Sequence, residues 1–177
     1  DAYVPGDILF SMNGKKIEML NSDAEGRLTL ADALTYAIRK ENAGSIIDIA
    51  TLTGAAQGAV GVRSSAGFSN DEGLYAEVEE ASERACEKIW RLPLDKELFP
   101  VIESEVADIQ NSAQGSTMGG GAIVAGLFLQ EFVEDHSWVH VDIAPVSWES
   151  KDIDYSIKGA TGYGVSLLYE TVKVISR

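Results

Sequence analysis

The chain is poor in residues that several classes of protein require. Its 177 residues include one cysteine, Cys86, and two histidines, His136 and His140. A single cysteine allows no internal disulfide, which fits a reducing compartment. Because Cys86 has acidic surroundings, including Glu87, we expect no nucleophilic role for its thiol. The sequence has no H-E-x-x-H motif and no Cys/His cluster, which excludes the histidine-rich zinc sites. We expect His140 to be a hydrogen-bonded core residue.

Positive charge and long apolar runs are also scarce. There are 14 Lys and Arg residues against 28 Asp and Glu residues, a net charge of −14. This charge repels phosphate backbones and anionic lipids, so we expect no nucleic-acid partner and no membrane partner. No apolar run approaches the roughly 20 residues of a membrane span. The chain opens without Met or a signal peptide, in what reads as a loop, so we expect a fragment of a cytoplasmic protein.

Two familiar catalytic motifs are missing as well. No G-x-S-x-G motif occurs, which argues against a serine hydrolase of the α/β type. The glycine run at 119–121 lacks a following G-K-[ST], so a phosphate-binding loop is disfavoured there. Close packing of the helix that follows is the better interpretation of these glycines.

The residues that are present favour an α/β domain. Apolar residues make up 45% of the chain, enough for a sizeable core in one domain, residues 1–177. Hydrophobic spacing and turn residues predict an alternation of helices and strands. The predicted elements are a hairpin (8–10 and 16–20), helices (24–40, 54–61, 72–87, 122–133 and 165–175), strands (45–50, 138–144, and a short strand or connector at 90–94) and loops (112–121 and 159–164).

This order predicts a layered α/β/α sandwich with a mostly parallel central sheet. The segments 45–50 and 138–144 are almost wholly apolar, which is typical of central strands buried on both faces.

One short segment, 21–28, concentrates chemistry-bearing side chains where a strand gives way to a helix. Asp23 and Glu25 offer carboxylate oxygens, which suit divalent cations and can bridge two of them. Arg27 offers a fork that can hold a planar anion. A structural alternative is open: Ser22 and Glu25 form a capping box, Asp23 favours the helix dipole, and Arg27 lies on the surface.

The sequence from position 21 reads NSDAEGRLTLADAL. It closely resembles the signature of the leucine aminopeptidase (cytosol aminopeptidase) family, N-T-D-A-E-G-R-L, with Ser22 in place of threonine. Similar motifs follow in the family's order across most of the chain: DIATLTG at 48–54, MGGGA at 118–122, FLQEF at 128–132, WVHVDIA at 138–144 and GATG at 159–162. The resemblance implies the C-terminal part of the family's catalytic domain.

The resemblance also implies an activity, the release of leucine-like apolar residues from the N-termini of peptides. It implies two divalent metal ions (Zn²⁺ or Mn²⁺, with Mg²⁺ as an alternative), a bicarbonate ion acting as general base, and a homo-hexamer for the full-length parent. The implied site residues are metal ligands Asp23 and Glu25, the bicarbonate-binding Arg27, backbone contacts from Leu52 and Gly54, and a side-chain pocket bordered by Thr51, Gly54, Ala144 and Ser147.

The chain departs from the family pattern in two ways. Family lysines and further aspartate ligands would lie upstream of position 1, so we expect the fragment alone to be inactive. Pro145 stands where the family usually has glycine. Two other functions are open, a non-catalytic oligomerisation scaffold and a DNA-binding regulator. The charge of −14 disfavours the second.

The expected loss of upstream strands yields a prediction about assembly. Several hundred Å² of bared apolar surface, at about 25 cal/mol per Å², amounts to roughly 10 kcal/mol. That is comparable with the whole stability of a domain, about 5–15 kcal/mol. The isolated chain should self-associate or require a companion chain, as measured by light scattering at low micromolar concentration. A monomer with cooperative unfolding would contradict this expectation.

Overall fold

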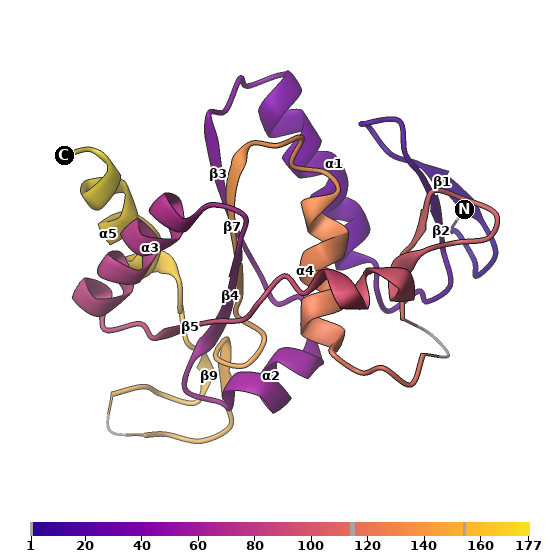
Figure 1. The fold of residues 1–177 in the computed structure, drawn as a ribbon. Helices are drawn as coiled ribbons and strands as arrows, with labels where there is room; N and C mark the ends of the chain where they lie inside the picture. Colours follow the sequence, from indigo (N-terminus) through magenta and orange to yellow (C-terminus); the bar gives the residue numbers. More distant parts are fainter. Residues whose placement is uncertain (1, 114–115, 154) are drawn as a thin grey trace. The chain divides into compact units, whose positions relative to one another are not determined.

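The computed structural model describes residues 2–113, 116–153 and 155–177, and part of the loop expected at 112–121 therefore lies outside the described residues. The chain divides into two units (Figure 1). Unit 1 comprises Asp1–Ile46 and Leu94–Ser137, and unit 2 comprises Ile47–Pro93 and Trp138–Arg177. Each unit contains segments that are distant in sequence.

Unit 1 combines a small sheet with helices. Its elements are β1 (Ile8–Phe10), β2 (Lys16–Glu18), α1 (Gly26–Arg39), the 3-10 helix η1 (Lys96–Ile102), β6 (Ile109–Gln110) and α4 (Gly121–Gln130). β1 and β2 form the predicted antiparallel hairpin, whose turn holds Gly14 at φ 98°. β6 adds to β2 in parallel, with Ile17 opposite Ile109.

Helices α1 and α4 lie side by side within unit 1 (Figure 1). α4 is buried on most sides, as predicted from its apolar sequence. Phe128 and Phe132 are fully buried, with ring centroids 5.2 Å apart. Thr35 of α1 is also buried and donates its hydroxyl to the Ala31 carbonyl one turn earlier.

Unit 2 is built on a four-stranded sheet in the order β3-β7-β4-β5. Its elements are β3 (Ser45–Ala50), α2 (Gly54–Val60), β4 (Ser65–Ser69), α3 (Glu72–Ala85), β5 (Ile89–Arg91), β7 (Ser137–Asp142), β8 (Trp148–Glu149), β9 (Gly159–Ala160) and α5 (Val165–Ile175); β3 and β7 start at the unit boundary. Helices α3 and α5 lie side by side (Figure 1) and share a core with the sheet.

The predicted α/β class is confirmed, and the sheets contain both strand directions. β2–β6 and β4–β5 are parallel pairs, whereas β1–β2 and β4–β7 are antiparallel. β7 lies between two strands and is buried from Trp138 to Asp142, as predicted. β4 was not predicted, because its sequence SAGFS has no β-branched residue and no alternation.

The open strand edge expected for the fragment falls on β3 in the described part of the chain. Within that part, β3 lies at an edge of the sheet, and Ile47 and Ile49 are only partly buried. The apolar sequence indicates which side chains require burial, but it does not supply the neighbour that would bury them. Among the described helices, none combines the length and apolar character of a membrane span.

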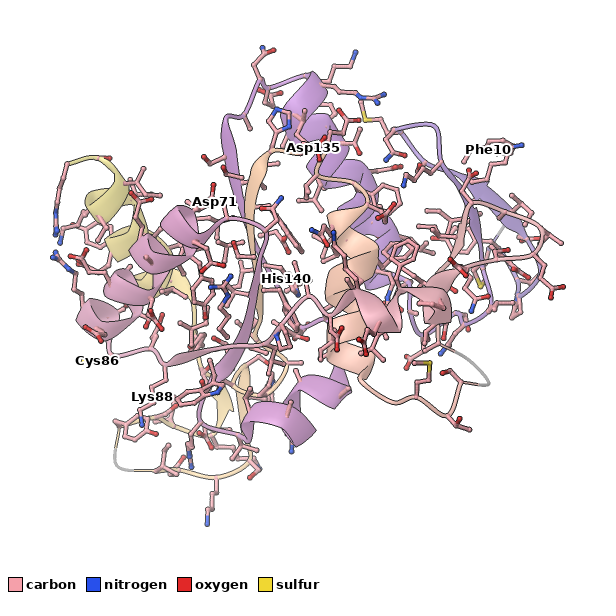
Figure 2. All side chains as sticks on the ribbon, in the orientation of Figure 1. Phe10, Asp71, Cys86, Lys88, Asp135 and His140 are labelled. Atoms are coloured by element: carbon pink, nitrogen blue, oxygen red, sulfur yellow. The ribbon has the colours of Figure 1, made fainter. Side chains whose placement is uncertain are left out.

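A buried polar network links β3 and β7 within unit 2. Asp48 accepts hydrogen bonds from Trp138 Nε1 at 2.7 Å and from His140 Nδ1 at 2.6 Å. His140 lies within the sheet (Figure 2), is fully buried, and stacks with the rings of Phe68 and Trp138 at centroid distances of 6.0 and 6.2 Å. The prediction that His140 is a hydrogen-bonded core residue is confirmed.

The capping-box alternative at the start of α1 is wrong. The helix begins at Gly26, not at 24, and its N-cap is Glu25, which makes no side-chain cap hydrogen bond. Side-chain caps occur instead at α2, where the Thr53 hydroxyl accepts from the Ala56 amide, and at α3, where Asp71 accepts from the Leu74 amide (Figure 2). The S-x-x-E pattern therefore leaves the Glu25 carboxylate available for another role.

This difference predicts the effect of two alanine substitutions. Asp71→Ala removes a real cap and should lower the free energy of unfolding by about 1 kcal/mol. Ser22→Ala removes an exposed hydroxyl that caps nothing and should change it by less than ~0.5 kcal/mol. Urea unfolding followed by circular dichroism measures both. An equal loss for the two variants would restore the capping-box interpretation.

Candidate functional site

The loop that carries the two candidate carboxylates precedes α1 in unit 1. It turns through a hydrogen bond from the Ala24 amide to the Asn21 carbonyl at 3.2 Å. The Asn21 side chain accepts from the Asp23 amide at 2.9 Å. Asp23 and Glu25 are both exposed, and Glu25 starts the helix with its backbone only. Two carboxylates two positions apart are therefore presented to solvent rather than used for capping.

A buried asparagine holds this loop from the protein side. Asn111 directly follows β6 and is fully buried. Its side-chain oxygen accepts from the amides of Leu20 at 2.9 Å and Asn21 at 3.2 Å. Its side-chain nitrogen donates to the carbonyls of Asn21 at 2.9 Å and Ala24 at 3.2 Å. One side chain thus fixes the loop at several points between 20 and 24, and the sequence pattern gave no indication of this role.

Arg27 lies in the first turn of α1 and is only 9% exposed. Its guanidinium carbon lies 5.8 Å from the centroid of the Phe128 ring on α4, within the range of a cation–π interaction. The alternative in which Arg27 is a surface residue is therefore wrong. A buried guanidinium therefore belongs to the helix turn that directly follows the two exposed carboxylates in sequence.

The described residues can supply part of a metal site. Asp23 and Glu25 are hard oxygen donors, which suit divalent cations such as Mg²⁺, Mn²⁺ and Zn²⁺. Over 2–113, 116–153 and 155–177, no group of three or more His, Cys, Asp or Glu side chains is arranged to hold a metal ion. The donor set therefore fits a shared site that needs further ligands, and the metal-ligand assignment stays a prediction.

The predicted substrate-binding residues all lie in unit 2, at the ends of two neighbouring strands. Thr51, Leu52 and Gly54 follow β3, and Ala144 and Ser147 follow β7. Thr51 and Gly54 are exposed, and the other three are half-buried. Gly54 is the first residue of α2.

Asp142, the last residue of β7, joins these two strand ends. It is 1% exposed. Its Oδ1 atom accepts from the amides of Leu52 at 3.0 Å and Ala144 at 3.1 Å. Its Oδ2 atom accepts from the Thr53 amide at 3.0 Å and the Thr53 hydroxyl at 2.7 Å. The structure therefore brings Leu52 and Ala144 together through one carboxylate, which the sequence analysis did not identify.

The turn after β7 accommodates Pro145, which is buried. The Ile143 carbonyl accepts from the amides of Val146 at 3.0 Å and Ser147 at 2.9 Å. Because the turn uses these two donors, the missing N–H of Pro145 leaves no hydrogen bond unmade. Proline is therefore compatible with this turn.

Comparison with known proteins decides the family. The catalytic domain of the cytosol aminopeptidase family matches residues 1–169. The chain belongs to the cytosol aminopeptidase family.

Curated relatives are similar over almost all of the chain. A probable cytosol aminopeptidase of Clostridium perfringens is 49% identical over 172 residues, which are 96% of this chain and 34% of that protein. Its counterpart from a Synechococcus strain is 51% identical over 171 residues, 97% of this chain and 33% of that protein. The chain thus spans about a third of the length of these cytosol aminopeptidases.

Solved structures agree with the fold described above. A mutant of tomato leucine aminopeptidase superposes with a TM-score of 0.89 at 44% identity, covering 99% of this chain and 33% of that one. The bottromycin maturation enzyme BotP superposes with a TM-score of 0.92 at 38% identity, covering 98% and 38% of the two chains. The resemblance seen in the sequence motifs is therefore confirmed as cytosol aminopeptidase family membership.

The buried asparagine generates a prediction for the candidate metal loop. Asn111→Ala leaves two amides and two carbonyls of the loop without this partner, at roughly 1–3 kcal/mol for each group that stays buried and unpaired. Hydrogen exchange at the amides of Leu20 and Asn21 should accelerate strongly.

The neighbouring residue offers a matched control. Gln110 donates to the carbonyls of Val101 and Ser112, outside the loop. Gln110→Ala should therefore leave exchange at Leu20 and Asn21 unchanged. Equal acceleration in both variants would show that Asn111 acts on general stability rather than on the loop.

Proposed function

We propose that the chain is part of a larger two-metal aminopeptidase that releases leucine-like, apolar N-terminal residues from peptides. The observation that supports this most directly is family membership over residues 1–169, combined with the exposed carboxylate pair of Asp23 and Glu25 in the family's signature segment. The chain spans about a third of its curated relatives, so the remaining ligands are assigned to other parts of that enzyme.

The signature segment would provide the metal chemistry. Asp23 and Glu25 would hold divalent ions, Zn²⁺ or Mn²⁺ with Mg²⁺ as an alternative, which polarise a carbonyl and lower the pKa of water. Arg27 would hold a bicarbonate ion, the proposed general base, because its planar fork matches a planar anion. Burial of the Arg27 side chain supports a fixed position for that charge.

Unit 2 would provide the peptide contacts. Backbone groups of Leu52 and Gly54 would bind the substrate's main chain, and Thr51, Gly54, Ala144 and Ser147 would border the pocket for its first side chain. The proximity of Leu52 and Ala144, which share Asp142 Oδ1, supports this grouping. The side chains at these positions are small, which suits a pocket for a leucine-sized residue.

We further propose a cytoplasmic homo-hexamer that acts on peptides and binds neither nucleic acid nor membranes. The net charge of −14 supports the last two points, because it repels phosphate groups. A non-catalytic oligomerisation scaffold is the second candidate function. The observation in its favour is that the described residues contain no complete metal site of their own.

The proposal predicts where activity resides. The 177-residue chain alone should not hydrolyse leucine p-nitroanilide above background in Zn²⁺ or Mn²⁺, because the described residues offer too few ligands. The larger enzyme should hydrolyse it in a metal-dependent way, and Glu25→Gln in that enzyme should lower kcat by at least ~100-fold, the scale expected when a group that stabilises transition-state charge is removed.

A matched substitution separates a ligand role from a change in surface charge. Glu41→Gln removes one exposed negative charge at the end of α1, outside the signature loop, and should leave kcat unchanged. Robust turnover by the 177-residue chain would refute the part-site proposal. If the larger enzyme folds without metal and shows no peptidase activity, the non-catalytic scaffold would be favoured.

A further inference from the structure

The Asp142 carboxylate is saturated by the protein itself. Its two oxygens accept four hydrogen bonds, from the amides of Leu52, Thr53 and Ala144 and from the Thr53 hydroxyl. Four donors match the acceptor capacity of an ionised carboxylate. Asp142 therefore has no acceptor site left for a ligand and can act on a ligand only through the loops that it holds.

These hydrogen bonds set the orientation of two peptide groups. A trans peptide directs its N–H and its C=O to opposite sides, and no cis peptide occurs among the described residues. Because the amides of Leu52 and Thr53 point at Asp142, the carbonyls of Thr51 and Leu52 point away from it. In the described part of the chain, neither carbonyl accepts any of the loop, turn or cap backbone hydrogen bonds.

The buried Asp142 carboxylate both satisfies the donors of these loops and sets their orientation. Asp142 is 1% exposed, and burying a carboxylate is costly even when it is hydrogen-bonded. An apolar side chain of similar volume would leave the amides of Leu52, Thr53 and Ala144 without this acceptor, which is costly for each amide that stays buried and unpaired. A fixed orientation of the two carbonyls is a benefit that an apolar side chain would not give.

We propose that Asp142 is a positioning residue that aims the carbonyls of Thr51 and Leu52 at the N–H groups of an extended peptide main chain. This inference rests on the function proposed above and assigns the orientation of its peptide-binding loop to one side chain. The metal-ligand candidates Asp23 and Glu25 belong to unit 1, whereas Asp142 and its partners belong to unit 2. Loss of the Asp142 carboxylate should therefore weaken peptide binding and leave the metal dependence of the larger enzyme unchanged.

The test uses Asp142→Asn, which keeps the size of the side chain. It replaces one carboxylate oxygen, which accepts two hydrogen bonds, with an NH₂ group that can only donate. In the 177-residue chain, hydrogen exchange at Leu52 and Thr53 should rise at least about tenfold, the effect of losing one hydrogen bond to a charged group. In the larger enzyme, KM for Leu-Gly-Gly should rise by about the same factor, on the same reasoning. The half-saturating Mn²⁺ concentration should stay unchanged.

A second pair of variants tests the same role without depending on correct folding of Asp142→Asn. Thr53→Val removes one of the four donors to Asp142, together with the hydroxyl that caps α2, and leaves the carboxylate, so KM should rise in the same direction. Thr53→Ser keeps the hydroxyl, so its KM should equal that of the wild-type enzyme. Asp135→Asn, an exposed aspartate at φ 63° in unit 1, is the charge-matched control and should change neither quantity (Figure 2).

The outcomes separate this inference from the function on which it rests. An unchanged KM in Asp142→Asn and Thr53→Val, with an active wild-type enzyme, would overturn the positioning role alone. A parallel loss of Mn²⁺ affinity would overturn it too, because it would indicate general disruption. A wild-type enzyme that does not cleave Leu-Gly-Gly would overturn the proposed function and this inference together.

Discussion

Each loop that carries candidate site residues is fixed by one buried polar side chain whose hydrogen bonds must all be made. In unit 1, Asn111 binds the backbone between Leu20 and Ala24, and in unit 2, Asp142 binds the backbone at Leu52, Thr53 and Ala144. An unpaired polar group at such depth costs on the order of 1–3 kcal/mol. The loops therefore have one strongly preferred backbone conformation, and the exposed groups that they present are pre-oriented.

A related pairing of buried polar groups occurs in the sheet of unit 2. Asp48 on β3 is matched by Trp138 and His140 on β7, so a carboxylate inside an apolar strand is paired by two ring N–H groups. Trp138, His140 and Asp142 occupy alternate positions of β7 and therefore lie on the same face of that strand. Polar pairing thus aligns the strand ends from which Thr51 to Gly54, Ala144 and Ser147 emerge.

Local sequence signals predicted much of this fold. The Asn13-Gly14 turn predicted the hairpin, and helical spacing predicted α3, α4 and α5 within a few residues. Two failures have physical causes. β4 was missed because its small residues are buried without forming an apolar pattern. The capping box failed because the same S-x-x-E spacing can place a carboxylate in solvent.

The candidate site was predicted from motif residues, whereas the side chains that hold it were not. Asn111 and Asp142 are single polar residues next to strands, and their roles depend on contacts about 90 positions away in the sequence. The central claim, that Asp23 and Glu25 bind divalent metal, is tested most directly by adding Mn²⁺ to the ¹⁵N-labelled chain and recording paramagnetic broadening of its amide signals. The account predicts that signals from 23–25 broaden first. Earlier broadening along the acidic helix α3, at Glu79, Glu80 and Glu83, would contradict it.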